Sequence, residues 1–161
     1  MADYVEQQNV ASIEPVFDPE LPIGSTRNMR TWYTTKGNQR TQRSQISHVV
    51  GDSAWEIYAA NIFDTSPLVT AYAKNDHLGF QVLYLWGGSR RRFLPDFIIR
   101  LGNGKTLVLE IKGEDSPQNV AKRDALKQWV EAVNAKGGFG TWCWDVAFKP
   151  AEVQDIVRRH G

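Results

Sequence analysis

Three residues that could carry out chemistry together, Asp96, Glu110 and Lys112, stand inside apolar segments of the sequence. Asp96 follows Pro95 in FLPDFII, and Glu110 and Lys112 end the run TLVLEIK. Charged side chains are costly in such surroundings unless they are paired or functional. Two carboxylates suit a hard divalent cation such as Mg²⁺ or Mn²⁺, and a nearby ammonium group can orient a water or offset phosphoryl charge. The pattern favours metal-assisted phosphodiester hydrolysis over a structural ion pair of Lys112 with one of the acids.

The strands that carry these residues decide whether they meet. In a strand with a period of two, Glu110 and Lys112 point to the same face. A three-residue turn, Gly102-Asn103-Gly104, places Asp96 across from Glu110 with Cβ atoms ~4.5–5.5 Å apart. A two-residue Asn103-Gly104 turn shifts the register by one and sends the two acids to opposite faces. Pro95 cannot donate to a ladder and indicates a strand edge or a bulge.

The remaining elements follow from hydrophobic period and end signals. A helix is expected from Ser53 to Asp64, opened by the capping-box pattern of Ser53 and Glu56, and a shorter helix over 67–74. Short β-like runs are expected within 31–36 and 45–50. Further strands are expected at 82–86, 93–101, 106–112 and 141–148, with a long helix between Ser116-Pro117 and Gly137-Gly138 and a short charged helix at the C-terminus. This order predicts an α/β fold, a central mixed sheet flanked by helices in the order αβββαβ.

Length and composition set the frame for this fold. The chain has 161 residues, 42% hydrophobic and 23% charged, which is typical of one globular domain. Residues 1–28 contain Pro15, Pro19 and Pro22 and read as an extended arm or linker, with the domain over 29–161. No apolar run reaches the ~20 residues of a membrane span, and no signal peptide is recognised, so a cytoplasmic location is expected.

Positive charge is local, because the net charge is only +1. Arg90, Arg91 and Arg92 are expected in the turn before the 93–101 strand. They are candidates for nucleic-acid phosphate contacts, and a solvated hairpin loop is the alternative.

The motif of Pro95-Asp96 followed by Glu110-Ile111-Lys112 resembles that of the PD-(D/E)xK nuclease superfamily. Over about residues 30–147 the chain also resembles the C-terminal endonuclease region of the Res subunits of type III restriction enzymes, through SHVVGDSAWE, LPDFIIRL, LVLEIKGEDSPQNVAKRDALKQWVEAVN and GTWCWDV. The resemblance implies a restriction-endonuclease-like core and a metal-dependent endonuclease that cuts DNA in defence against foreign DNA.

By the same resemblance, Asp96 and Glu110 ligate Mg²⁺ or Mn²⁺ with the Ile111 carbonyl assisting, and Lys112 serves the attacking water. Glu56 is the matching position for a further acid, although the capping box already gives it a local use. Asp115 and Gln118 lie near enough in sequence to reach the site, or else they cap the following helix.

This chain departs from the Res subunits in carrying no ATP-driven motor. Gly104-Lys105-Thr106 ends like a P-loop, but Ile99 stands where the first glycine is required. The resemblance implies DNA as the partner, with a helicase motor, a specificity or methyltransferase subunit, or a second copy of the chain as further partners. A standalone nuclease, a nuclease part of a larger assembly, and a preference for RNA stay open. The alternative function is a catalytically silent module on the same fold that binds nucleic acid or protein.

Overall fold

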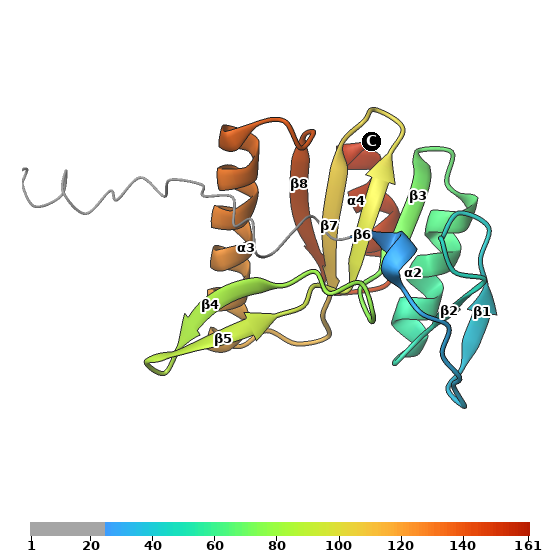
Figure 1. The fold of residues 1–161 in the computed structure, drawn as a ribbon, viewed down its shortest axis with the longest axis horizontal. Helices are drawn as coiled ribbons and strands as arrows, with labels where there is room; N and C mark the ends of the chain where they lie inside the picture. The colour runs from blue at the N-terminus through green and yellow to red at the C-terminus, as the bar shows by residue number, and fades with distance from the viewer. Residues whose placement is uncertain (1–24) are drawn as a thin grey trace, which may run out of the picture.

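The computed structural model describes residues 25–161, in which a four-stranded sheet carries helices on both faces and a separate β-hairpin projects from one end (Figure 1). The helical segments are the 3-10 turn η1 (Thr26–Asn28) and the helices α2 (Ala54–Thr65), α3 (Pro117–Lys136) and α4 (Glu152–His160). The strands are β1 (Asn38–Arg40), β2 (His48–Val50), β3 (Val69–Lys74), β4 (Val82–Trp86), β5 (Ser89–Phe93), β6 (Phe97–Leu101), β7 (Thr106–Ile111) and β8 (Trp142–Ala147). Most of the predicted arm over 1–28 lies outside the described residues.

The central sheet is mixed, with the strand order β3–β6–β7–β8. Strands β3, β6 and β7 are antiparallel neighbours, whereas β7 and β8 run parallel. A parallel pair needs a long crossover, and α3 supplies it. The elements of this layer follow the chain as α2–β3–β6–β7–α3–β8, with the β4–β5 hairpin inserted between β3 and β6. The predicted α/β class with a mixed sheet flanked by helices is therefore confirmed.

Alternation along β7 builds a separate core on each face of the sheet. Leu107 and Leu109 face a core formed with α2 and α4, and Val108 faces a core formed with α3 and the hairpin. The buried members of the first core, beyond the two leucines, are Val49, Ala59, Ala60, Phe63, Val69, Tyr72, Phe97, Ile99, Leu101, Ala147, Val153, Ile156 and Val157. The other buried members of the second core are Val82, Tyr84, Phe93, Leu126 and Val130.

The ends of the two long helices follow the predicted signals. The Ser53 hydroxyl accepts the N–H of Glu56 at 3.3 Å, and the Ser116 hydroxyl accepts the N–H of Asn119 at 3.2 Å. Pro117 occupies the first turn of α3, where its missing N–H leaves no hydrogen bond unmade. These caps fix where α2 and α3 begin, and both helix starts lie close to the acidic residues described below.

Three of the predicted elements are wrong. Residues 67–74 do not form a helix, because 69–74 pair with β6 as a strand that buries Tyr72 and Ala73. The predicted single strand over 93–101 is two strands, β5 and β6, separated around Pro95, which has no N–H to give to a ladder. The β-like run at 31–36 is not a strand, and β1 lies at 38–40 instead, paired with β2 inside the predicted run at 45–50.

The β4–β5 hairpin forms a sheet of its own. Gly87 and Gly88 make its two-residue turn with φ of 57° and 72°, a left-handed conformation that favours glycine and matches the twist of the strands. Strand β4 packs against α3, so one face of the hairpin belongs to the second core.

No helix within residues 25–161 combines the length and apolar composition needed to cross a bilayer.

Candidate metal-binding site

Asp96 and Glu110 approach each other at the end of the β6–β7 hairpin. The ladder pairs Phe97 with Leu109, and continuing that register by one pair places Asp96 opposite Glu110. The Leu101 N–H donates to the Lys105 carbonyl at 2.9 Å across the three residues of the turn. Of the two registers that the sequence allows, the structure has the one that brings the two carboxylates to one face.

Backbone contacts hold Asp96 in position. Its Oδ2 atom accepts the N–H of Ile111 at 2.7 Å, and its carbonyl accepts the N–H of Asn75 at 2.8 Å. The Asn75 side chain in turn donates to the carbonyl of Pro95 at 3.0 Å. The Asp96 carboxylate is thus fixed between β3 and β7, although it lies just before β6. The Ile111 group that contacts Asp96 is the N–H, and the role of the Ile111 carbonyl as a metal ligand stays a prediction.

Glu110 carries an unsatisfied hydrogen-bond acceptor. Its Oε2 atom is buried and has no hydrogen-bond partner among the described residues. A buried carboxylate oxygen without a partner costs at least ~1–3 kcal/mol, so such an atom calls for an explanation. Glu110 lines a cavity of about 10 Å³, which has room for about one water molecule or one ion. The other residues that line it are Phe93, Lys112, Asn119, Lys122, Arg123 and Val146.

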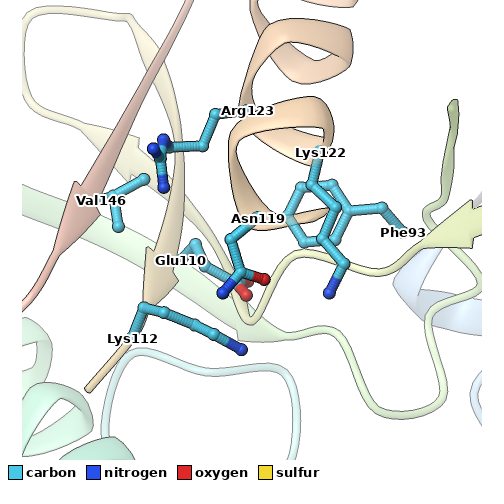
Figure 2. A pocket seen from close by; sticks show the side chains of 7 residues that line it. All are labelled: Phe93, Glu110, Lys112, Asn119, Lys122, Arg123 and Val146. Carbon is cyan, nitrogen blue, oxygen red and sulfur yellow. The ribbon is translucent and has the colours of Figure 1, made fainter. Parts of the chain in front are cut away.

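Figure 2 shows how the polar groups lie around this cavity. In this view the Glu110 carboxylate overlaps the amide of Asn119, and the amino groups of Lys112 and Lys122 extend below it and to its right. Lys112 comes from the end of β7, as its spacing from Glu110 predicts, while Asn119 and Lys122 come from the first turns of α3. The cavity therefore combines a buried carboxylate with a positively charged rim.

The pKa values of the two carboxyl groups respond to this environment. Burial raises the pKa of Asp96 to about 6, with Glu56 adding to the rise and the N–H of Ile111 opposing it. Burial likewise raises the pKa of Glu110 to about 8, and the charge of Asp96 adds to the rise while Lys112 and Lys122 oppose it. Two carboxylates this close repel each other unless a proton or a cation lies between them. Near neutral pH the pair holds a proton in the absence of a cation, and a cation would displace it.

The donor set fits Mg²⁺ or Mn²⁺ better than a softer metal. Asp96 and Glu110 supply hard oxygen ligands, and Mg²⁺ in proteins takes one or two carboxylates and keeps several waters. Within the part of the chain that the structure describes, no group of three or more His, Cys, Asp or Glu side chains is arranged as a ready ligand set. The two acids are thus the ligands on offer, and water or a phosphate oxygen would complete the shell.

Glu56 is close to the two acids but is engaged elsewhere. Its Oε2 atom accepts the N–H of Asp52 at 2.9 Å and lies 3.1 Å from the ammonium group of Lys74. The capping box is therefore half formed, since the Glu56 carboxylate bonds the residue before Ser53. Glu56 influences the pKa of Asp96, so it lies within electrostatic reach of the pair. Its predicted part as a metal ligand stays a prediction.

Lys74 is a functional candidate that the sequence did not reveal. Its residue is only 3% exposed, and its ammonium group lies 2.7 Å from Asp76, 3.1 Å from Glu56 and 3.4 Å from Asp52. Burial lowers the pKa of Lys74, but Asp76 and Glu56 raise it by more, so the group stays charged. Its charge also lowers the pKa of Asp96. No sequence signal identified it, because the segment around it was predicted to be a helix.

Asn119 and Lys122 were also missed, although a signal for them existed. The cap at Ser116 starts α3, and residues three apart on a helix lie on one face. Asn119, Lys122 and the neighbouring Arg123 follow this spacing and line the cavity together. A helix that begins just after Lys112 must direct its first polar face toward the end of β7.

Two of the predicted residues contact other groups. Asp115 accepts the N–H of Ser116 at 2.9 Å and forms a two-bond ion pair with Arg123 at 2.6 and 2.8 Å. The Gln118 side chain donates to the hydroxyl of Tyr84 at 2.6 Å. Asp115 therefore supports the start of α3 and Gln118 joins α3 to β4. Within residues 25–161 no hydrogen bond or ion pair links either side chain to Asp96 or Glu110. Arg90, Arg91 and Arg92 do not lie in a turn, because they form the middle of β5.

Comparisons of the chain with protein-family models, with curated proteins and with solved structures find no match.

Proposed function

We propose that this chain is a metal-dependent endonuclease domain with a restriction-endonuclease-like core of the PD-(D/E)xK type, acting on DNA. The observation that carries the proposal is the half-buried Asp96–Glu110 pair, in which a buried Glu110 oxygen lacks a hydrogen-bond partner within residues 25–161 and Glu110 lines a small cavity together with Lys112. Among the described residues no lysine or arginine forms an ion pair with Glu110 or Asp96, so a shared proton or a bound cation must offset the repulsion between the two carboxylates.

Asp96 and Glu110 would hold the divalent ion. When bound, Mg²⁺ or Mn²⁺ supplies a Lewis acid that polarises a phosphoryl oxygen and lowers the pKa of a bound water. The Ile111 N–H fixes the orientation of Asp96, and the cavity beside Glu110 has room for about one ion or water molecule. Lys112 then orients the attacking water or offsets the charge that grows on the phosphoryl oxygens, and Lys122 adds a second positive charge on the same side.

The proposed setting is restriction-type defence in the cytoplasm. Within it, the chain acts alone, as a homodimer, or with an ATP-driven motor and a specificity or methyltransferase subunit. The fit of two acids and a lysine to phosphodiester hydrolysis supports the reaction, and the resemblance of the longer sequence string to Res subunits supports this setting.

The test is cleavage of supercoiled plasmid DNA and of a labelled RNA in Mg²⁺ or Mn²⁺. We expect the wild type to nick or linearise the plasmid and EDTA to stop it. Asp96→Ala, Glu110→Ala and Lys112→Ala should each reduce cleavage by about 100-fold or more. Each variant should still show a cooperative melting transition, which shows that it is folded.

Lys127→Ala is a matched control, because Lys127 also lies on α3 but its ammonium group is exposed and faces Glu131. It should cleave like the wild type. Cleavage that survives in EDTA, or that survives in all three site variants, contradicts the proposal. Cleavage of the RNA alone would keep the chemistry and change the substrate.

A further inference from the structure

The outer face of the β4–β5 hairpin is not used by the fold. The ladder pairs Leu83 with Arg92 and Leu85 with Arg90, so these four side chains share one face. Leu83 is 51% exposed and Leu85 is 72% exposed, and both arginines are exposed as well. Two exposed leucines on the same face of a strand make a small apolar patch that a partner can cover. We call these four residues the ribbon face.

The inner face of the same hairpin packs against the protein core. Tyr84 and Phe93 are buried in the core beneath α3, and Trp86 packs against that core. The aromatic side chains of the hairpin are therefore turned away from the ribbon face. Proteins that bind single strands present aromatic platforms on which bases stack, and the ribbon face offers none.

The charge of the hairpin is unbalanced. From Val82 to Phe93 it carries three arginines and no acidic residue. Within residues 25–161, no ion pair or side-chain hydrogen bond engages these arginines. Two of the three, Arg90 and Arg92, lie on the ribbon face. Arginine can contact phosphates and can also bond the guanine edge in two places at once, so a polyanionic partner with exposed base edges suits this face.

The hairpin is also rooted beside the candidate metal site. Phe93, the last residue of β5, lines the cavity that contains Glu110, and Asp96 follows three residues later. The ring of Phe93 also lies 5.4 Å from the amino group of Lys122. Figure 1 shows the two strands extending away from that end of the sheet. The root of the hairpin and the acidic pair are therefore neighbours, so a polymer bound to the hairpin would be held next to the candidate site.

We propose that the ribbon face enters the major groove of double-stranded DNA and seats the duplex against the Asp96–Glu110 site. This inference rests on the proposed function. A two-stranded ribbon fits the ~12 Å major groove of B-form DNA, whereas the major groove of an RNA duplex is too narrow for side chains to read. Five residues per strand give a ribbon of ~17 Å, close to half a turn of the DNA helix. In this arrangement Leu83 and Leu85 contact thymine methyl groups, and Arg90 and Arg92 contact bases or phosphates.

The test uses the full chain, a 25-base-pair duplex and the matching single strand, with EDTA present so that no cutting occurs. Binding is followed by fluorescence anisotropy. The double variant Arg90→Ala/Arg92→Ala should weaken duplex binding by about tenfold or more, because each good arginine contact contributes about that factor. Leu83→Ser/Leu85→Ser should weaken duplex binding several-fold and single-strand binding much less.

Arg91→Ala is the matched control. The sequence alone offers Arg91 as a phosphate contact together with Arg90 and Arg92. In the structure it pairs with the buried Tyr84, so it has the same charge on the same strand but lies on the other face, outside the ribbon face. It should change duplex binding by less than about threefold, and melting temperatures check that every variant is folded. If Arg91→Ala weakened duplex binding as much as the double arginine variant does, or if the ribbon-face variants weakened duplex and single-strand binding equally, the face would be a general positive patch. Either result would overturn the inference. Leucine variants that change the oligomeric state but not DNA binding would assign the face to a protein partner and also overturn it.

A separate readout tells this inference from the proposed function. Wild-type hydrolysis of bis(4-nitrophenyl) phosphate in Mn²⁺ needs no groove and reports only on the metal site. Duplex binding that depends on the ribbon face without any such hydrolysis would leave the inference standing and count against the nuclease. Hydrolysis without the ribbon effect would do the reverse.

Discussion

At the scale of single residues, the Asp96–Glu110 pair links the proposed chemistry to stability. Both carboxyl groups have pKa values above those of an unfolded chain, about 6 and about 8, chiefly because they are buried. The folded protein therefore binds more protons than the unfolded protein between about pH 4 and pH 8. Stability must then fall as the pH rises through this window, because the folded chain has to give up protons that it holds more tightly.

We expect the free energy of unfolding in EDTA to fall by a few kcal/mol, as an order of magnitude, from pH 5 to pH 8, and the melting temperature to fall with it. Glu110→Gln should remove most of this fall, since it deletes the group with the higher pKa. Mn²⁺ at pH 8 should raise the melting temperature of the wild type and not that of Glu110→Gln, because only the former offers the second carboxylate. A wild type that is more stable at pH 8 than at pH 5 in EDTA would contradict this account of the pair.

Lys74 should matter for stability because it is the buried charge that its acidic neighbours share. Replacing it with methionine keeps the shape but leaves Glu56 and Asp76 without their nearest cation. We expect Lys74→Met to lower the free energy of unfolding by about 2–4 kcal/mol, less than for a fully buried pair because Asp76 is partly exposed. Lys36→Met is the control: Lys36 also pairs with Asp52, but both side chains are exposed, so the urea midpoint should barely move. Equal effects of the two substitutions would refute the difference in burial as the cause.

At the scale of secondary-structure elements, the local signals of the sequence were sufficient for the starts of α2 and α3 and for the strand that carries Glu110. The alternation of TLVLEIK fixed the shared face of Glu110 and Lys112, and Ser53, Ser116 and Pro117 fixed where two helices begin. The register of the β6–β7 hairpin could be stated only as two alternatives, because turns of two and three residues were both compatible with Gly102-Asn103-Gly104.

The errors arose where tertiary pairing outweighs local preference. The segment VTAYAK favours a helix or a strand about equally on composition, and its pairing with β6 decides the outcome. Lys74 could not be found for the same reason, since its acidic partners come from the start of α2 and from Asp76 only after β3 joins the sheet. The arginines of β5 were assigned to a turn because β5 and β6 belong to different sheets, and the chain passes from one to the other around Pro95. Hydrophobic periodicity does not indicate such a change of sheet.

The start of α2, which carries Glu56, depends on a close backbone approach at Gly51. A Cβ atom added there would lie 2.5 Å from Cγ1 of Ile57 and 3.0 Å from the Ser53 carbonyl oxygen. Gly51→Ala should therefore shift the first turn of α2 and lower the free energy of unfolding by about 1–3 kcal/mol. Gly37→Ala is matched to it, because Gly37 accepts the Gly51 N–H across the β1–β2 pair but has open space around its own Cα. Chemical denaturation should find Gly37→Ala close to the wild type, and a similar loss in both would rule out the contact with Ile57 as the cause.

At the scale of the whole molecule, the sheet makes one folding unit of two cores. Neighbouring residues on β7 serve opposite faces, so neither core can form without the strand that they share. Four of the six tryptophans, Trp86, Trp129, Trp142 and Trp144, pack against the core beneath α3. Tryptophan fluorescence therefore reports mainly on one face of the sheet, while far-UV circular dichroism reports on all helices and strands.

This arrangement lets cooperativity be tested with two adjacent residues. Leu107→Ala makes a cavity in the core with α2 and α4, far from most tryptophans, and Val108→Ala makes one in the core beneath α3. Each side chain is fully buried, so we expect losses of about 2–4 kcal/mol in the free energy of unfolding. Because both faces depend on β7, the fluorescence and dichroism midpoints in urea should coincide for both variants and move together from the wild type. Should Leu107→Ala shift the dichroism midpoint and leave the fluorescence midpoint in place, the two faces unfold separately. The Asp96–Glu110 pair would then depend for its stability on the α3 face alone.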